Sequence, residues 1–127
     1  MNAATGTTTV LVRARPWQSD RANPREDILV EDWSHPDFTG WAVEGDAFGK
    51  GPIERAAMPA YQGDVGGPTK RVANSHGAAP ANEVRGRDAC VGSLSRTIRA
   101  ERDFLTLWIG GGSHEGTAVE LLRDGAV

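Results

Sequence analysis

Glycine and proline divide this chain into short segments, which limits the folds that it can adopt. Its 127 residues include 16 glycines and 7 prolines, and no stretch shows apolar residues at the spacing of an amphipathic helix. Glycine and proline interrupt helices and strands and favour turns. We therefore expect an all-β protein of short strands and many turns, not a helix bundle.

The length and composition fit one small globular domain. Hydrophobic residues make up 39% of the chain, which is enough for one modest core, and no run approaches the ~20 apolar residues of a spanning helix. The net charge is −3 and the arginines are dispersed, so we expect neither a nucleic-acid nor a membrane partner. The apolar residues 10–12 are too short a run for a signal peptide, so we expect none in this chain.

The first 26 residues differ from the rest in charge and composition. They contain four arginines against Asp20 and Glu26, whereas the remainder of the chain is acidic. Residues 16–27 combine two prolines with polar residues, which is typical of a linker. We therefore expect an N-terminal extension or linker at 1–26 and a β-sandwich module at 27–127.

Several segments of residues 27–127 are typical of strands. Residues 103–109 are apolar on both faces, which predicts the central strand of a sheet. Asp124-Gly125 follows the expected strand 117–123 and is a strong hairpin signal, but only two residues come after it. We expect this sequence to be a fragment whose sandwich is incomplete at its C-terminus. The other expected strands are residues 27–33, 41–44, 70–75 and 91–99, with a polar loop at 76–89.

A glycine-rich loop, "GGGSHEG" at 110–116, fails the catalytic templates that it superficially fits. Glu115 stands where a dinucleotide fingerprint or a nucleophile elbow needs glycine, and no lysine is near to complete a P-loop. Alanine replaces the second histidine of a zinc-protease helix. We interpret this loop as a turn in which glycine allows positive φ or close backbone approach.

The remaining candidate groups define no catalytic or metal site by spacing. His35, His76, His114 and Cys90 show no zinc-ligand spacing, and the acidic residues are too evenly spread to select an acid/base pair. Cys90 is the only cysteine, so no internal disulfide can form. Trp33, Trp41 and Trp108 fall on expected strands and are predicted to belong to the core.

Three stretches together resemble a known type of module. They are "DILVEDW…FTGWAVEGDAFGKGP", "VANSH" and "GSLS…TI…RDFLTLWIGGGSHEGTAVELLRDG", within residues 27–127. They resemble the β-sandwich accessory module found with family 32 glycoside hydrolases (levanase- and fructosidase-like proteins) and in large secreted multidomain bacterial proteins. The resemblance implies an antiparallel sandwich of jelly-roll, galactose-binding-like type, an extracellular or periplasmic location, and neighbouring domains in the parent protein.

The resemblance does not extend to glycosidase activity. The catalytic domains of that family contain Asn-Asp-Pro, Arg-Asp-Pro and Glu-Cys, whereas here Arg87-Asp88 and Arg102-Asp103 lack the proline and Cys90 follows alanine. By resemblance, a structural calcium is expected near the first strand, where Glu31 and Asp32 offer oxygen ligands. The alternative for this pair is a solvated strand end.

We predict a polar-ligand site where the loops after 70–75 and after 103–109 reach one rim of the sandwich. Asparagine and histidine offer the donors and acceptors that sugar hydroxyls need, and glycine exposes backbone N–H groups. A competing interpretation is that these side chains only tie the loops together. The predicted site residues are Asn74, His76, Gly111, Gly112, His114 and Glu115.

The sequence thus leaves three functions open. The first is a non-catalytic, carbohydrate-binding-like accessory module whose ligand is a fructan or another glycan. The second is an N-terminal fragment of a family 32 hydrolase whose catalytic domain lies elsewhere, and the third is a structural spacer. We expect no enzyme activity from this fragment, because none of the catalytic templates is complete.

Overall fold

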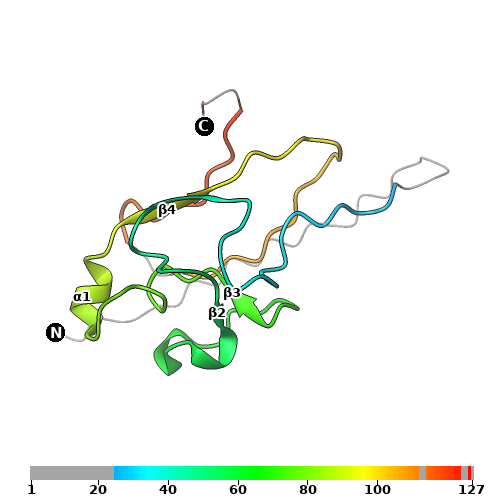
Figure 1. Cartoon of the computed structure of the whole chain (residues 1–127). Helices are drawn as coiled ribbons and strands as arrows, with labels where there is room; N and C mark the ends of the chain where they lie inside the picture. Colours follow the sequence, from blue (N-terminus) through cyan, green and yellow to red (C-terminus); the bar gives the residue numbers. More distant parts are fainter. Residues whose placement is uncertain (1–24, 112–113, 124–125, 127) are drawn as a thin grey trace.

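The computed structural model describes residues 25–111, 114–123 and 126 (Figure 1). Within these residues regular structure is mostly strand: four strands form two small antiparallel sheets, and there is one short α-helix. The all-β class expected from glycine and proline is therefore supported at this coarse level. The elements are β1 (Ala42–Gly45), β2 (Ile53–Glu54), η1 (Arg55–Ala57), η2 (Ala60–Gln62), β3 (Arg71–Val72), α1 (Val84–Asp88) and β4 (Gly92–Ser95).

The longer sheet joins β1 to β4 in antiparallel register, with Ala42 opposite Ser95 and Gly45 opposite Gly92. Both strands fall on segments that the sequence predicts to be strands. Gly45 has φ +71°, and a Cβ at this position would overlap the Val91 carbonyl oxygen. Glycine is therefore required where β1 turns away from β4.

The shorter sheet pairs β2 with β3, so that Ile53 lies opposite Val72 and Glu54 opposite Arg71. An ion pair between Arg71 Nε and Glu54 Oε1 (2.8 Å) crosses the two strands. β3 lies inside the expected strand 70–75. One turn of 3-10 helix, η1, follows β2 and ends before Pro59, a residue that cannot continue a helix because it lacks a backbone N–H.

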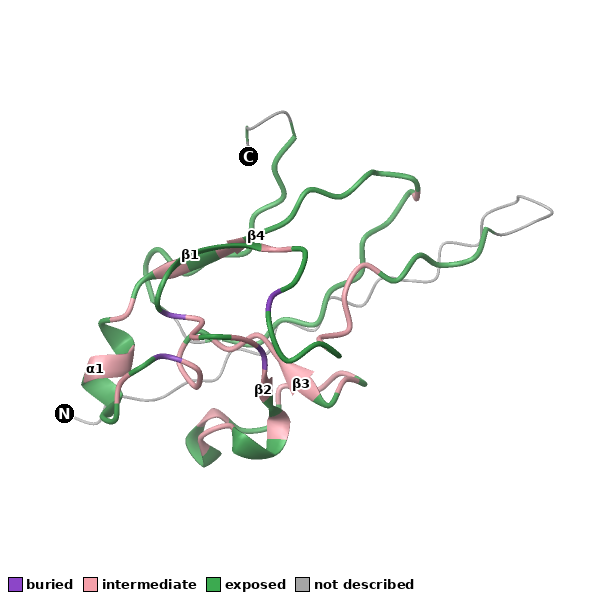
Figure 2. Ribbon diagram, viewed as in Figure 1, coloured by how far each residue is buried: buried purple, intermediate pink, exposed green. Residues whose placement is uncertain are grey.

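The core is small and gathers around an aromatic cluster. Phe38, Ala47 and Ala79 are buried, and the Phe38 ring meets those of Trp33 and Phe48 edge-on at centroid distances of 5.9 and 6.3 Å. Figure 2 shows how few segments are buried and how much of the surface is exposed. Trp33 and Trp41, which were predicted to be strand residues of the core, are half-buried and lie outside the strands, and Trp108 is exposed, so its assignment to the core was wrong.

The expected strand at 27–33 does not form. Glu31 Oε1 accepts hydrogen bonds from the backbone N–H groups of Asp32 (3.1 Å) and Trp33 (2.8 Å), and Trp33 has φ +55°. Backbone donors that a strand would offer to a neighbour are thus used by a local side chain. Glu31 Oε2 also accepts from Trp41 Nε1 (2.8 Å) and Arg96 Nη1 (3.1 Å), which ties this segment to the end of the longer sheet where β1 begins and β4 finishes.

The expected strands at 103–109 and 117–123 are also absent. Residues 98–111, yellow to orange in Figure 1, instead leave the end of β4 as an extended loop. This segment returns to the loop at residues 63–67, before β3, where the Trp108 ring lies against Gly66 and Gly67. Apolar residues on both faces favour a buried strand only when other strands provide hydrogen-bond partners and cover, and none of the four described strands pairs with this segment.

The hairpin signal at Asp124-Gly125 is confirmed by the residues that flank it. Arg123 and Ala126 form an antiparallel bridge, with N···O distances of 2.8 and 3.1 Å. Asp124 and Gly125 themselves lie outside the described residues, as do residues 1–24, which include most of the expected extension at 1–26.

The expected polar loop at 76–89 contains the α-helix α1, which the sequence analysis missed. Its five residues, Val84–Asp88, include a glycine and have no buried side chain, so hydrophobic periodicity gave no signal for it. In the described part of the chain, no helix is long and apolar enough to span a bilayer.

Candidate functional site

Asn74 organises the turn that follows β3. Its Oδ1 accepts hydrogen bonds from the backbone N–H groups of His76 (3.0 Å) and Gly77 (2.7 Å). Its Nδ2 donates to Gln62 Oε1 of η2 at 2.8 Å. One predicted site residue thus shapes the turn that presents another, and it links that turn to η2.

His76 lies between a carboxylate and a phenol. Its Nδ1 is 3.0 Å from Asp88 Oδ1 at the end of α1, and its Nε2 is hydrogen-bonded to the Tyr61 hydroxyl of η2. For a neutral imidazole, both contacts are satisfied when Nδ1 holds the proton and donates to Asp88. Nε2 then accepts the hydrogen bond from the Tyr61 hydroxyl.

These residues form one polar cluster that draws on η2, the turn after β3 and the end of α1. The His76 side chain is 17% exposed and that of Asp88 46%, whereas Tyr61 is 62% exposed. The Tyr61 and His76 rings meet edge-on, with centroids 5.7 Å apart and planes at 78°. We call this group the Tyr61 cluster: Tyr61, Gln62, Asn74, His76 and Asp88.

The structure places the other predicted site residues differently. His114 and Glu115 are exposed, in a turn closed by a hydrogen bond from Thr117 N to the His114 carbonyl (3.3 Å). Gly111 is exposed, with nothing within 4 Å of an added Cβ, and Gly112 lies outside the described residues. The structure brings Asn74 and His76 together. Their hydrogen bonds and ion pairs do not reach the described residues of the glycine-rich loop at 110–116.

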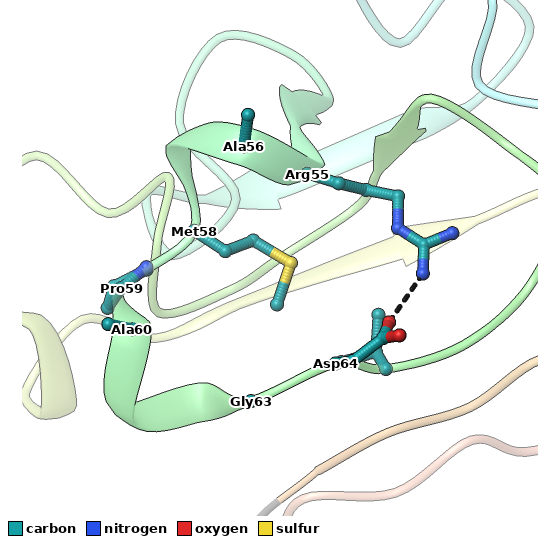
Figure 3. A pocket seen from close by; sticks show the side chains of 8 residues that line it. Arg55, Ala56, Met58, Pro59, Ala60, Gly63 and Asp64 are labelled. Atoms are coloured by element: carbon teal, nitrogen blue, oxygen red, sulfur yellow. Dashed lines mark hydrogen bonds and ion pairs between the residues drawn. The ribbon is translucent and has the colours of Figure 1, made fainter.

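An open hollow lies between η1, η2 and Asp64 (Figure 3). Its volume is about 410 Å³, and Met58 extends into it beside the ion pair of Arg55 Nη2 with Asp64 Oδ1 (2.7 Å). The N–H of Gly66, together with Arg55, lowers the pKa of the Asp64 carboxyl from its ordinary value. The segment η2 thus contributes Ala60 to the hollow and Tyr61 to the cluster.

The residues expected near calcium are hydrogen-bonded to the protein. Glu31 accepts the donors described above, and Asp32 Oδ1 accepts from Ser34 N at 2.9 Å. Hydrogen bonds from the Ser34 hydroxyl and N–H lower the pKa of Asp32. Asp32 also borders a second hollow, of about 520 Å³, with Glu54 and Lys70. The described residues contain no group of three or more histidine, cysteine or acidic side chains placed to hold a metal.

Cys90 shows no sign of an activated thiol. Desolvation, together with Asp46, raises the pKa of the Cys90 thiol, and its Sγ lies 3.4 Å from the Gly86 carbonyl oxygen. A raised pKa leaves less thiolate at neutral pH, so this side chain is a poor nucleophile.

The sequence analysis missed Tyr61, Gln62 and Asp88. The Tyr61–His76 contact spans 15 residues and the Asn74–Gln62 contact spans 12, so no local spacing signals either. Comparison with family models, curated proteins and solved structures finds no match for this chain. The resemblance to the family 32 accessory module therefore stays a prediction.

Proposed function

We propose that this chain is a non-catalytic carbohydrate-binding accessory module of an extracellular multidomain protein, with the Tyr61 cluster as its binding face. A jelly-roll β-sandwich is the architecture that we propose with it. The observation that supports this function most directly is the exposed Tyr61 ring, which meets His76 edge-on in the same polar cluster as Gln62 and Asn74.

The chemistry of the cluster fits sugar hydroxyls. An aromatic ring offers an apolar face with a polar edge, and amide, imidazole and carboxylate groups offer both donors and acceptors. The turn at Asn74 is held by three hydrogen bonds of that side chain: two are accepted from backbone N–H groups and one is donated to Gln62. A site fixed in this way loses less conformational freedom when a ligand binds.

Calorimetric titration with levan, inulin and a panel of other glycans tests the proposal. We expect one of these glycans to bind and Tyr61→Ala to weaken its binding at least tenfold, because the stacking ring is lost. Phe104→Ala is the matched control, since Phe104 is 65% exposed and Tyr61 62%. Equal loss in the two variants, or no binding by the wild type, would refute the proposed face.

Exposed apolar side chains favour a second candidate function, packing against a neighbouring domain of the parent protein. The exposed large hydrophobic residues include Leu107, Trp108 and Leu121, and patches of this kind are typical of interaction sites. Hydrogen exchange of this chain with and without the neighbouring domain tests the idea. We expect slower exchange at 104–122 in the complex, and unchanged exchange there would refute it.

A further inference from the structure

The imidazole of His76 lies between the carboxylate of Asp88 and the phenolic hydroxyl of Tyr61. In this arrangement the imidazole can take up the proton of the hydroxyl. The carboxylate of Asp88 faces Nδ1 of His76 at 3.0 Å, and Nε2 faces the phenolic hydroxyl of Tyr61. This is the sequence of groups by which a carboxylate orients an imidazole and the imidazole acts as base toward a nucleophile. In this array the hydroxyl belongs to tyrosine.

The surroundings of the three groups favour this role. Tyr61 is largely exposed and can meet a reagent, whereas His76 is shielded and held in place. Asp88 Oδ1 faces Nδ1 of the imidazole, where it favours the tautomer that accepts the phenolic proton at Nε2.

We propose that Tyr61 is an O-acylation site, at which small activated acyl donors modify the phenol with His76 as general base. The Tyr61 oxygen attacks the carbonyl carbon, forming an O–C bond while the bond from that carbon to the leaving group breaks. The phenolic proton passes to Nε2 of His76 and then to the leaving group. Asp88 is a positioning residue that acts through His76, and one acyl group is transferred per chain. This inference does not depend on the proposed sugar binding.

The composition of the chain makes the test direct. Tyr61 is the only tyrosine, so O-acetyltyrosine formed with N-acetylimidazole reports on this residue alone. Peptide mass mapping distinguishes it from acetylated lysine, and hydroxylamine reverses it. We expect native Tyr61 to be acetylated at least tenfold faster than N-acetyltyrosinamide at neutral pH, at the low end of typical general-base effects.

Variants separate base catalysis from folding. We expect His76→Gln and Asp88→Asn to reduce the acetylation rate of Tyr61 at least tenfold and a few-fold respectively, and Asp88→Glu to recover part of the loss. The matched controls His35→Gln and Asp64→Asn change a histidine and an aspartate outside the cluster and should leave the rate unchanged.

If His76→Gln does not fold, the wild-type chain unfolded in urea gives the acetylation rate of Tyr61 without the native arrangement of Tyr61, His76 and Asp88. Native acetylation no faster than in urea or in N-acetyltyrosinamide would overturn the proposal. It would also be overturned by equal losses in Asp88→Asn and Asp64→Asn. Because the assay contains no sugar, its result is independent of the glycan titration.

Discussion

Residues 30–97 and residues 98–122 use their side chains in opposite ways. The first region contains both described sheets, the buried residues and most of the long-range side-chain hydrogen bonds, including those that involve Asn74, His76 and Arg96. The second is richer in large apolar residues, yet these are mostly exposed and belong to neither of the described sheets. Hydrophobic content alone therefore does not decide which part of this chain is well packed.

The two regions differ in packing because their segments have different hydrogen-bonding and packing partners. In 30–97 each short strand meets another short strand, and polar side chains such as Glu31 satisfy the intervening backbone. In 98–122 the described contacts reach mainly the 63–67 loop and residues 25–26, through Trp108, Arg102 and Arg25. An apolar segment contributes to stability in proportion to the area that it removes from water.

The largest expected effect compares two phenylalanines. Phe38 is 8% exposed and Phe104 65%. We expect Phe38→Ala to lower the free energy of unfolding by about 3 kcal/mol, because it opens a cavity in the core. Phe104→Ala should cost less than about 1 kcal/mol. Urea unfolding followed by tryptophan fluorescence measures both, and equal losses would show that the two regions are packed alike.

A slightly smaller effect is expected at two glycines. Gly45 has positive φ and faces the Val91 carbonyl, whereas a Cβ at Gly111 would meet nothing within 4 Å. We expect Gly45→Ala to destabilise the chain by about 2 kcal/mol through backbone strain and overlap. Gly111→Ala should be nearly neutral. A thermal melt of each variant measures the difference, and a harmless Gly45→Ala would contradict the register of β1 with β4.

The smallest expected effect is an acid dependence confined to the first region. The pKa values of Asp32, Asp37 and Asp64 are lowered, chiefly by hydrogen bonds from Ser34, from Thr39 and from Gly66 respectively. A carboxyl whose pKa is lower when folded stabilises the protein above its unfolded value, here 3.8, and this contribution is lost as the pH falls through the folded value.

Hydrogen exchange against pH therefore sharpens the comparison. Below pH 3.8 we expect amides around Gly66 to lose protection, and Asp64→Asn to remove part of that pH dependence. Glu120→Gln, in the second region, is the control and should leave the profile unchanged. A loss of protection that begins in 98–122 would contradict the assignment of the acid-sensitive contacts to 30–97.

Local signals in the sequence predicted much of the backbone in the first region. The strand patterns located β1, β3 and β4 within a few residues. Outside that region, the hairpin signal at Asp124-Gly125 agrees with the bridge between Arg123 and Ala126. The prediction failed at 27–33, where Glu31 uses the strand's own donors, and at 103–109, which pairs with none of the strands that the structure describes. The first failure comes from hydrogen bonds to the next two residues, which alternation of apolar residues does not reveal. The second depends on contacts beyond the reach of a short sequence window.

The candidate site divides in the same way. The sequence by itself predicted a strand at 70–75 followed by a polar loop, and it named Asn74 and His76 as site residues. In the structure β3 ends at Val72, and Asn74 lies in the turn after it. Only the tertiary structure decided that Tyr61 and Asp88 lie on either side of the His76 ring. Those residues are distant along the chain and come from η2 and α1, so the contact depends on how three loops fold back on one another. The spacing of residues along the sequence does not predict which loops meet, whereas the hydrogen bonds in the folded chain define those contacts.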